Sequence, residues 1–250
     1  MRQVPCNRDS LSLFCYGIIG AGRIARHISR YFDLAGVPYI QKGCRDLSSQ
    51  EIISTFSECE ILLVVISDDQ IEEFIKTKLG FHPKSAIVHF SGCLSLPGIQ
   101  SAHPLMTFAD GLYDLEFYKR IPFVCEKNKT RFTDLFPALQ NTVHYIDSES
   151  KTYYHALCVM AGNFTTLLWQ KLFRGFEISL GIPHESAHLY MQKIAENLIL
   201  APEKALTGPF ARGDDRVIEK HFAALRNDSF CGVYSAFAEL FGKKLEKKND

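Results

Sequence analysis

Residues 13–25 read Leu-Phe-Cys-Tyr-Gly-Ile-Ile-Gly-Ala-Gly-Arg-Ile-Ala, and this stretch decides the fold. Its first part, residues 13–19, is a short apolar run of the kind that forms a strand buried on both faces of a sheet. Residues 22–35 follow with apolar side chains at helical spacing. The glycines therefore lie in a tight turn between a buried strand and a helix.

This turn fits the pattern Gly-x-Gly-x-x-Ala. The first glycine permits the tight turn, the second lets the backbone approach a pyrophosphate, and the small third residue lets the helix pack against the strand. A diphosphate would accept hydrogen bonds from the free amides of the helix N-terminus. The alternative is a glycine-rich turn without a ligand. We expect the turn to bind a dinucleotide through Gly20, Gly22, Arg23, Ile24 and Ala25.

The segment that would meet the adenosine ribose indicates which dinucleotide is bound. Residues 39–45 read Tyr-Ile-Gln-Lys-Gly-Cys-Arg, with two bases and no acid. An acid near this position usually bonds the ribose 2′-hydroxyl of NAD, whereas basic side chains attract the 2′-phosphate of NADP. We therefore predict NADP as the cofactor, bound by Lys42 and Arg45 with help from Arg23. The alternative is that these are ordinary solvated charges.

Strands and helices alternate up to residue 146. Further strands are predicted at residues 37–41, 61–66, 86–90, 121–125 and 143–146, with helices at 48–57, from Asp68 onward and near 129–140. This alternation predicts an α/β fold, namely a doubly wound Rossmann sheet that helices cover on both faces. Because ligands lie at the carboxyl ends of parallel strands, we add Ile66, Ser67, Ser91 and Gly92 to the predicted cofactor site. Asp68 alternatively serves as a helix N-cap.

The second part of the chain has only helical periodicity. Helices are predicted at 151–180, 184–200, 213–225 and 228–242, so residues 1–148 form the predicted NADP-binding domain and residues 149–250 an all-α domain. The first of these helices is apolar nearly all round, which indicates burial on several sides. We expect it to contribute both to the core and to a homodimer formed through the helical domain.

Composition narrows the functional classes. The 250 residues carry 28 basic and 28 acidic side chains, which argues against nucleic acid and an anionic membrane as partners. The eight cysteines have neither metal-knuckle nor redox-motif spacing, so we predict reduced thiols, no metal site and a cytoplasmic location. No apolar stretch has the length of a membrane span.

Three further segments stand out. They are residues 101–108 (Ser-Ala-His-Pro-Leu-Met-Thr-Phe), residues 154–164, which begin with Tyr-His and end with Ala-Gly-Asn-Phe, and residues 205–214 (Ala-Leu-Thr-Gly-Pro-Phe-Ala-Arg-Gly-Asp). With the glycine-rich turn, they resemble a bacterial family in which a Rossmann-like NADP-binding domain precedes a helical domain of formerly unknown function. That helical domain is similar to the C-terminal domain of 6-phosphogluconate dehydrogenase. A divergent class of ketopantoate reductases, which serve pantothenate and coenzyme A synthesis, looks like this family.

The resemblance implies reduction of a carbonyl by NADPH, which leaves a developing alkoxide. A general acid must protonate this oxygen, and fixed donors must stabilise it. His155 is the natural acid near neutral pH, and Asn163 offers both a donor and an acceptor. The alternatives are a surface histidine and a structural asparagine.

Three further residues are candidates for substrate contact. Thr207 offers a hydroxyl beside a glycine, and the fork of Arg212 matches a substrate carboxylate. The alternative for Arg212 is an ion pair with Asp214. His103 lies in an extended segment at the expected edge of the cleft, where its alternative is a loop histidine with satisfied hydrogen bonds.

The chain departs from the common ketopantoate reductases, which use a lysine and an asparagine four residues apart. Here Lys151 is followed by His155, and Lys171 is followed by Gly175. Either lysine is therefore an alternative to His155 as the acid.

We expect an NADPH-dependent reductase of a small 2-oxo acid, with ketopantoate as the first candidate. An imine or pyrroline-carboxylate reductase is the alternative enzyme. A sensor that binds NADP without catalysis is the alternative from another class.

Overall fold

The computed structural model describes residues 14–44, 47–79 and 85–246 of the chain. The chain divides into two compact units, Met1–Thr166 and Leu167–Asp250. The predicted division at residue 149 stays a prediction. Arg45, one of the predicted cofactor residues, lies outside the described residues.

The first unit is built on a sheet of seven strands in the order β2-β1-β3-β4-β5-β6-β7. The strands are β1 (Tyr16–Ile19), β2 (Tyr39–Lys42), β3 (Ile61–Val64), β4 (Ala86–His89), β5 (Gln100–Pro104), β6 (Phe123–Glu126) and β7 (Val143–Ile146). The first five run parallel to one another, as predicted. The pair β5–β6 is antiparallel, whereas β6 and β7 run parallel to each other. The apolar runs mark where strands lie but carry no signal for their direction.

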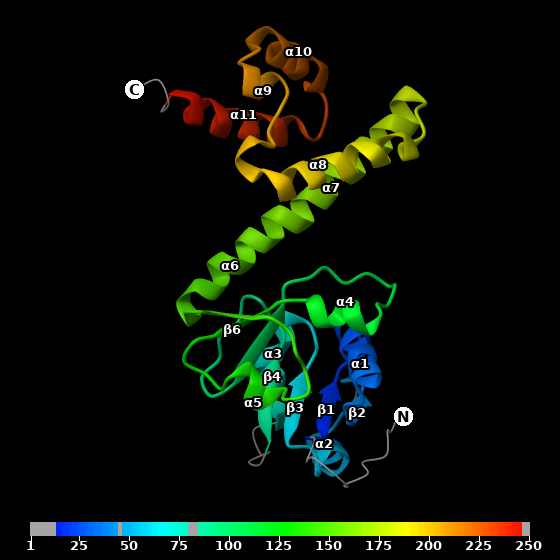
Figure 1. Cartoon of the computed structure of the whole chain (residues 1–250), viewed down its shortest axis with the longest axis vertical. Helices are drawn as coiled ribbons and strands as arrows, with labels where there is room; N and C mark the ends of the chain where they lie inside the picture. The colour runs from blue at the N-terminus through cyan, green and yellow to red at the C-terminus, as the bar shows by residue number, and fades with distance from the viewer. Residues whose placement is uncertain (1–13, 45–46, 80–84, 247–250) are drawn as a thin grey trace. The chain divides into compact units, whose positions relative to one another are not determined.

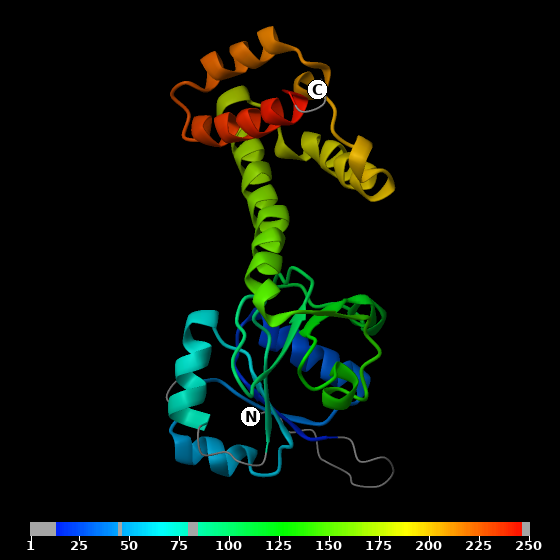
Figure 2. The same cartoon turned by 90° about the vertical axis from the view of Figure 1, so that its left-hand side faces the viewer.

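Helices cover both faces of this sheet (Figures 1 and 2). They are α1 (Arg23–Ala35), α2 (Ser49–Phe56), α3 (Asp68–Phe74), continued by the π-helical turn η1 (Ile75–Leu79), then α4 (Leu115–Arg120) and α5 (Phe132–Leu135). One hydrophobic core lies between the sheet and helices α1, α4 and α5, and a second lies between the sheet and helices α2 and α3. The predicted Rossmann-type α/β fold is thus confirmed.

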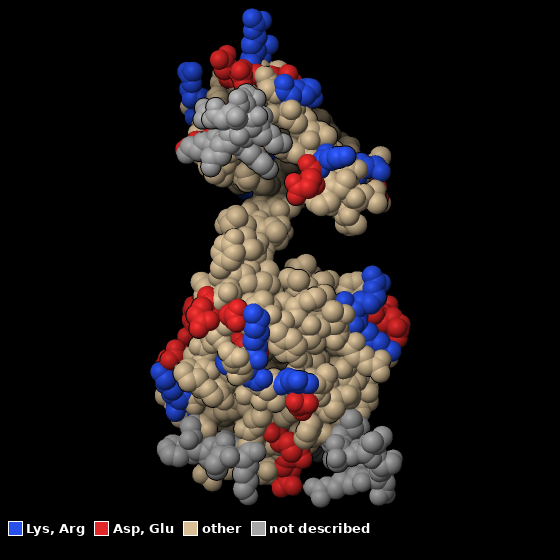
Figure 3. Space-filling model, turned by 60° about the vertical axis from the view of Figure 1, so that its left-hand side comes forward, with Lys and Arg blue, Asp and Glu red and all other residues tan. Residues whose placement is uncertain are grey.

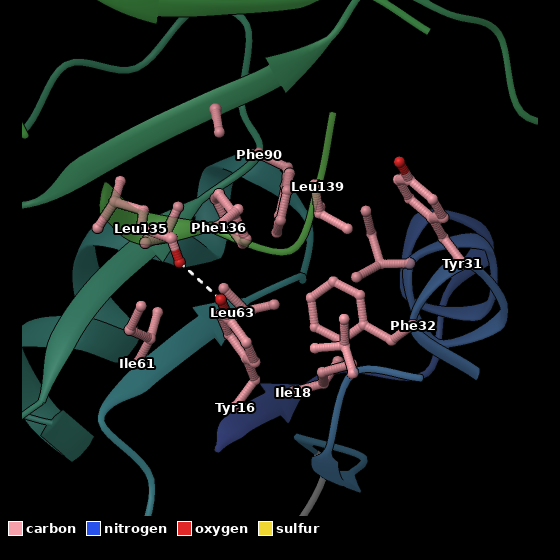
Figure 4. Close-up of a cluster of buried hydrophobic side chains, with 14 of the residues drawn as sticks. Tyr16, Ile18, Tyr31, Phe32, Ile61, Leu63, Phe90, Leu135, Phe136 and Leu139 are labelled. Atoms are coloured by element: carbon pink, nitrogen blue, oxygen red, sulfur yellow. Dashed lines mark hydrogen bonds between the residues drawn. The ribbon is translucent and has the colours of Figure 1, made fainter. Parts of the chain in front are cut away.

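Figure 4 shows the larger core, in which aromatic rings join α1, β1 and the segment after α5. The Tyr16 ring stacks on Phe136 with centroids 5.7 Å apart, and its hydroxyl donates to the Leu135 carbonyl oxygen at 2.7 Å. The buried phenol therefore keeps a hydrogen-bond partner, which removes most of the cost of its desolvation. This packing anchors β1, the strand that leads into the glycine-rich turn.

Local capping explains two helix starts. Ser48 caps α2 and forms a reciprocal capping box with Glu51. The N-cap of α3 is Ser67, so the assignment of Asp68 as a cap was wrong. Asp68 instead accepts a hydrogen bond from the Ser91 hydroxyl at 2.6 Å. Its carboxylate therefore ties the β3–α3 turn to the turn that follows β4.

Helical segments follow one another from Lys151 to Leu180. They are α6 (Lys151–Cys158), the π-helical segment η3 (Val159–Phe164), α7 (Thr165–Arg174) and the π-helical segment η4 (Gly175–Leu180). The remaining helices are α8 (His188–Leu200), α9 (Pro209–Arg212), α10 (Asp215–Leu225) and α11 (Cys231–Glu246), with short 3-10 turns at Ser148–Ser150, His184–Ala187 and Pro202–Lys204. The predicted all-α C-terminal region is confirmed. No helix in the described part of the chain is long and apolar enough to cross a bilayer.

Candidate functional site

A cavity of about 650 Å³ lies at the carboxyl ends of β1 and β3. Its walls are the β1–α1 turn, the residues after β2 and the β3–α3 turn. The lining residues are Gly20, Ala21, Gly22, Arg23, Ile24, Gly43, Cys44, Val65, Ile66, Ser67 and Gln70. Most of the predicted dinucleotide-binding residues therefore meet in one cavity, at the edge of the sheet where α/β folds bind ligands.

Gly20 is fixed by its neighbours on both sides. Its φ of 144° is one that residues with a Cβ rarely adopt, and an added Cβ would stand 2.1 Å from the Val65 carbonyl oxygen. Its amide donates to the Lys42 carbonyl oxygen at 2.9 Å, and its own carbonyl oxygen accepts from Gln41 Nε2 at 2.9 Å. Strands β2 and β3 thus hold the turn at the N-terminus of α1.

The N-terminus of α1 has the features of an anion site. Its N-cap is Gly22, which makes no side-chain capping bond, and no acidic residue lies in its first turn. Gly22 also has open space where a Cβ would stand, with no atom within 4 Å. Ala25 is fully buried against the core, as the small third position of the pattern requires. The cradle therefore fits a diphosphate that approaches the backbone amides.

Two of the three basic side chains predicted to bind a 2′-phosphate belong to the described residues, and both are exposed. Lys42 is the last residue of β2, and Arg23 lines the cavity at the start of α1. Ile66 and Ser67 line the cavity from the β3–α3 turn, and the exposed Ser67 hydroxyl makes no capping bond.

The turn after β4 brings two histidines together. Ser91 is buried, and its hydroxyl accepts hydrogen bonds from the amides of Cys93 and Leu94, which shapes the turn around Gly92. A Cβ on Gly92 would stand 2.6 Å from His155 Cδ2 and 3.0 Å from His103 Nε2. Only glycine leaves room for both rings at this turn. Sequence reasoning proposed each of the three residues, and the structure joins them from β4, β5 and α6.

The two imidazoles differ in their surroundings. Their ring centroids are 5.7 Å apart at an angle of 78°. Burial, with the nearby His155 and Lys151, lowers the pKa of His103 to about 4, so its ring is neutral at pH 7. His103 Nδ1 lies 2.7 Å from the Tyr154 hydroxyl. Tyr154 lies in the quoted 154–164 segment, but sequence reasoning assigned it no role.

A buried ionic cluster lies next to this site. The Lys151 ammonium donates to Ser101 Oγ at 2.8 Å and lies 3.6 Å from Glu126 Oε2. Lys129 forms a shorter ion pair with the same carboxylate, at 2.8 Å. Burial by itself would raise the pKa of Glu126, but hydrogen bonds outweigh it and lower the pKa to about 2; they come from Lys129, Ser101, Ser95 and Ser148.

The cluster shows that Lys151 anchors α6 to β5 and β6. Its side chain is buried, and burial lowers the pKa of its ammonium. Sequence reasoning missed Glu126 altogether, although an acid at the end of an apolar strand was a visible signal.

The other predicted catalytic residues lie in different elements and have different surroundings. Asn163 is exposed within the π-helical segment η3, a rare conformation that often marks functional sites. Thr207 is exposed in the second unit. Arg212 Nε donates to Asp214 Oδ2 at 2.8 Å, which is the ion pair weighed as its alternative. Lys171, the other alternative acid, pairs with Asp228 at 2.5 Å.

Neither charge nor thiols point to another kind of site. On the face drawn in Figure 3, basic and acidic side chains are interspersed on each unit. The described residues contain no cluster of three or more His, Cys, Asp or Glu side chains that would hold a metal ion. The seven cysteines within the described residues are free.

Comparison with known proteins supports the fold. No curated protein sequence matches the chain. Residues 123–240 match the sequence model of a domain of unknown function, DUF2520. The chain is similar to the structure of a candidate NADP oxidoreductase from Bacteroides fragilis, with a TM-score of 0.73 and 20% identity over 92% of this chain and 98% of that one.

Two other structures cover almost the same length. A protein from Thermotoga maritima has a TM-score of 0.68 and 22% identity over 94% of this chain and 100% of that one. An imine reductase from Myxococcus stipitatus, in complex with NADP+, has a TM-score of 0.61 and 12% identity over 93% of this chain and 94% of that one. At these identities the similarity shows a shared fold.

Proposed function

We propose that the chain is an NADPH-dependent reductase of a small 2-oxo acid, with ketopantoate as the first candidate. The observation that carries this proposal is the cavity at the uncapped N-terminus of α1, with Gly20 and Gly22 in its wall. The NADP complex of the similar imine reductase and the family resemblance support the same cofactor.

Several residues would hold the cofactor. The amides at the start of α1 would bind the diphosphate, and Lys42 and Arg23 would bind the 2′-phosphate, with Arg45 as a further candidate. Ile66, Ser67 and the Ser91–Gly92 turn lie at the ends of neighbouring strands, along the path toward the two histidines. Bound NADPH would supply a hydride to the carbonyl carbon.

The histidines beside Gly92 then have a role at the carbonyl oxygen. As hydride arrives at carbon, negative charge develops on oxygen, and a donor held at that position stabilises it. His155 is our candidate for the acid that delivers the proton, because imidazole is suited to acid catalysis near neutral pH. Because Lys151 is buried in an ionic cluster, it is a weaker candidate than His155.

Three polar side chains are candidates for contact with the substrate. We propose Arg212 as the partner of the substrate carboxylate, with Thr207 and Asn163 as further polar contacts. Asp214 would then hold the guanidinium ready through the ion pair already present. The resemblance to divergent ketopantoate reductases is what favours a branched 2-oxo acid over other carboxylates.

An imine is the alternative substrate. The similarity to an imine reductase favours it, since a protonated imine also accepts hydride at carbon. A protein that binds NADP without turnover is the second alternative.

We also propose a cytoplasmic homodimer formed through the helical region. Among the described residues of the second unit, only Ala187 is buried, while Leu189, Ile199 and Leu200 are 74%, 81% and 81% exposed. Apolar exposure of this kind marks surfaces that another chain covers. Sedimentation analysis that finds a monomer at every concentration would remove this proposal.

The test is NADPH oxidation followed at 340 nm with a panel of ketopantoate, simple 2-oxo acids and cyclic imines. We expect saturable turnover on ketopantoate and its loss in His155→Ala. Turnover on the imines alone would replace the leading substrate with the alternative. NADPH binding without turnover on any compound would favour the non-catalytic protein.

A further inference from the structure

His103 and Tyr154 form a pair whose geometry assigns them separate tasks. His103 Nδ1 faces the Tyr154 hydroxyl at 2.7 Å, whereas Nε2 faces the Gly92 turn, 3.0 Å from the position of an added Cβ. One ring nitrogen is therefore engaged by the protein, and the other lies beside the Gly92 turn.

The hydrogen bond to Tyr154 determines which nitrogen carries the proton. A phenol is a strong donor and a weak acceptor, so the favoured arrangement has the Tyr154 hydroxyl donating to a bare Nδ1. Burial and the nearby Cys158 thiol raise the pKa of Tyr154, which keeps its proton on the phenol. The single proton of the neutral His103 ring then resides on Nε2.

The surroundings keep this arrangement in place. Lys151, one turn before Tyr154 on α6, is anchored to Ser101 Oγ at 2.8 Å. Ser101 and His103 both belong to β5, so the first turn of α6 is tied to the strand that carries the imidazole. The groups that face His103 are Tyr154, His155 and Lys151, and the last two oppose a second proton on its ring.

We infer that Tyr154 fixes His103 in the neutral tautomer protonated at Nε2, and that this N–H is a preset donor to the substrate's reacting oxygen at the Gly92 turn. His103 then stabilises charge without giving up its proton, while the proton comes from His155. Tyr154 is a positioning residue that acts through His103. The donor role rests on the proposed reductase function, whereas the tautomer does not.

The tautomer is measured directly by long-range ¹H–¹⁵N correlation spectra of ¹⁵N-histidine protein at pH 7. The His103 signals are assigned by their absence in His103→Gln. We expect the pattern of a ring protonated at Nε2 and bare at Nδ1 in the wild type, and a mixture of tautomers in Tyr154→Phe. Tyr153→Phe is the matched control, because Tyr153 is a 71% exposed neighbour on the same helix. A wild-type ring protonated at Nδ1, or a Tyr154→Phe spectrum unchanged from wild type, would overturn the inference.

Amide substitutions test the donor role. Glutamine places its NH₂ near the position of Nε2, whereas asparagine reaches only that of Nδ1. We expect His103→Gln to keep kcat within about tenfold of wild type and His103→Asn to lose about a hundredfold or more. Tyr154→Phe should lower kcat about five- to tenfold at an unchanged Kd for NADPH. Equal loss in both amide variants would contradict the donor role.

A wild-type protein without turnover would refute the proposed function and the donor role together. The spectra would still decide the tautomer in that case.

Discussion

The carbonyl oxygen of Val65 stands 2.1 Å from the position that a Cβ on Gly20 would take, so β3 closes one side of the glycine turn. Gly22, two residues later, has open space at the position that its own added Cβ would take. The two glycines of one motif therefore differ: the chain's own packing requires the first, and the second leaves open space where we propose that the diphosphate binds.

This difference predicts opposite behaviour for two alanine variants. Gly20→Ala should lower the free energy of unfolding by about 2 kcal/mol or more, because the turn must move away from Val65. Gly22→Ala should melt within a degree or two of wild type yet bind NADPH at least about tenfold more weakly. Thermal melting and isothermal titration measure the two effects. A Gly22→Ala protein with unchanged affinity would place the diphosphate elsewhere.

Lys42 should distinguish the two nicotinamide cofactors. Loss of a charge-assisted bond to the 2′-phosphate costs about 1.5–3 kcal/mol, so Lys42→Ala should weaken NADPH binding about tenfold or more and leave NADH binding nearly unchanged. Lys76→Ala is the control. Lys76 is an exposed lysine in the π-helical turn η1, and it pairs with Glu72 of α3. Equal effects on both nucleotides would show that Lys42 does not read the phosphate.

Gly92→Ala should disable the site without unfolding the protein. The new methyl group would meet His155 Cδ2 at 2.6 Å, and the rings must shift to accept it. We expect a loss in kcat of at least about tenfold, since donors misplaced by a fraction of an ångström stabilise charge poorly. Gly111→Ala is the control, because no atom lies within 4 Å of its added Cβ. Wild-type kcat in Gly92→Ala would separate the histidines from the chemistry.

The sequence predicts the cofactor turn better than the histidine site. The motif at Gly20 is local, because strand, turn and helix are consecutive and each has its own pattern. The pairing of His103 with His155 joins β5 to α6 across 52 positions, and no periodicity reports a contact of that range. The same reason hides most partners of Glu126, because Ser95, Ser101, Ser148 and Lys151 are distant in sequence and only Lys129 is a near neighbour.

The bounds or type of shorter elements were predicted less accurately for a different reason. Helix α5 has only the four residues Phe132–Leu135, whereas the apolar spacing suggested a helix near 129–140. Phe132 of α5 and Phe136 just after it stand at helical spacing and pack on Phe123 and Tyr16, respectively. Tertiary packing therefore created the pattern without a long helix. Strand β5 was predicted only as an extended segment, because Ser101 and His103 interrupt its apolar character.

Acid should destabilise the first unit in a defined range. Burial lowers the pKa of His89 to about 3, and the positive charges of Lys151 and Lys129 contribute smaller shifts in the same direction. The pKa of His103 is also lowered, to about 4. Below the ordinary pKa near 6.5 the unfolded chain binds protons that the folded chain does not, so stability falls as pH drops from 6.5 to 4. Each histidine contributes a slope of about 1.4 kcal/mol per pH unit.

Asparagine at position 89 keeps an acceptor near the place of Nδ1, which accepts from the Ser91 amide at 3.2 Å. His89→Asn should therefore flatten the dependence of the unfolding free energy on pH between 6.5 and 4. Denaturant unfolding at several pH values measures the slope. An identical slope in the variant would mean that His89 titrates normally in the folded protein.

Glu126→Gln should be among the most destabilising single changes in the first unit. It removes the carboxylate that lies 2.8 Å from the Lys129 ammonium and leaves two buried or largely buried lysines without a counter-charge. Breaking such a buried pair costs about 3–5 kcal/mol. Asp147→Asn, which breaks the exposed pair with Lys127, should cost less than about 1 kcal/mol. Similar losses of unfolding free energy in the two variants would show that the cluster does not act as a buried ion pair.

The proposed reaction transfers a hydride from NADPH to a carbonyl substrate. Its most direct measurement uses NADPH deuterated at C4, on either face in separate reactions, with ketopantoate and mass analysis of the product. We expect one of the two labelled nucleotides to yield a hydroxy acid that carries deuterium. The experiment is done at a nucleotide concentration that saturates the protein. If all of the label stays in the nucleotide and the substrate is unchanged, the proposed hydride transfer is contradicted.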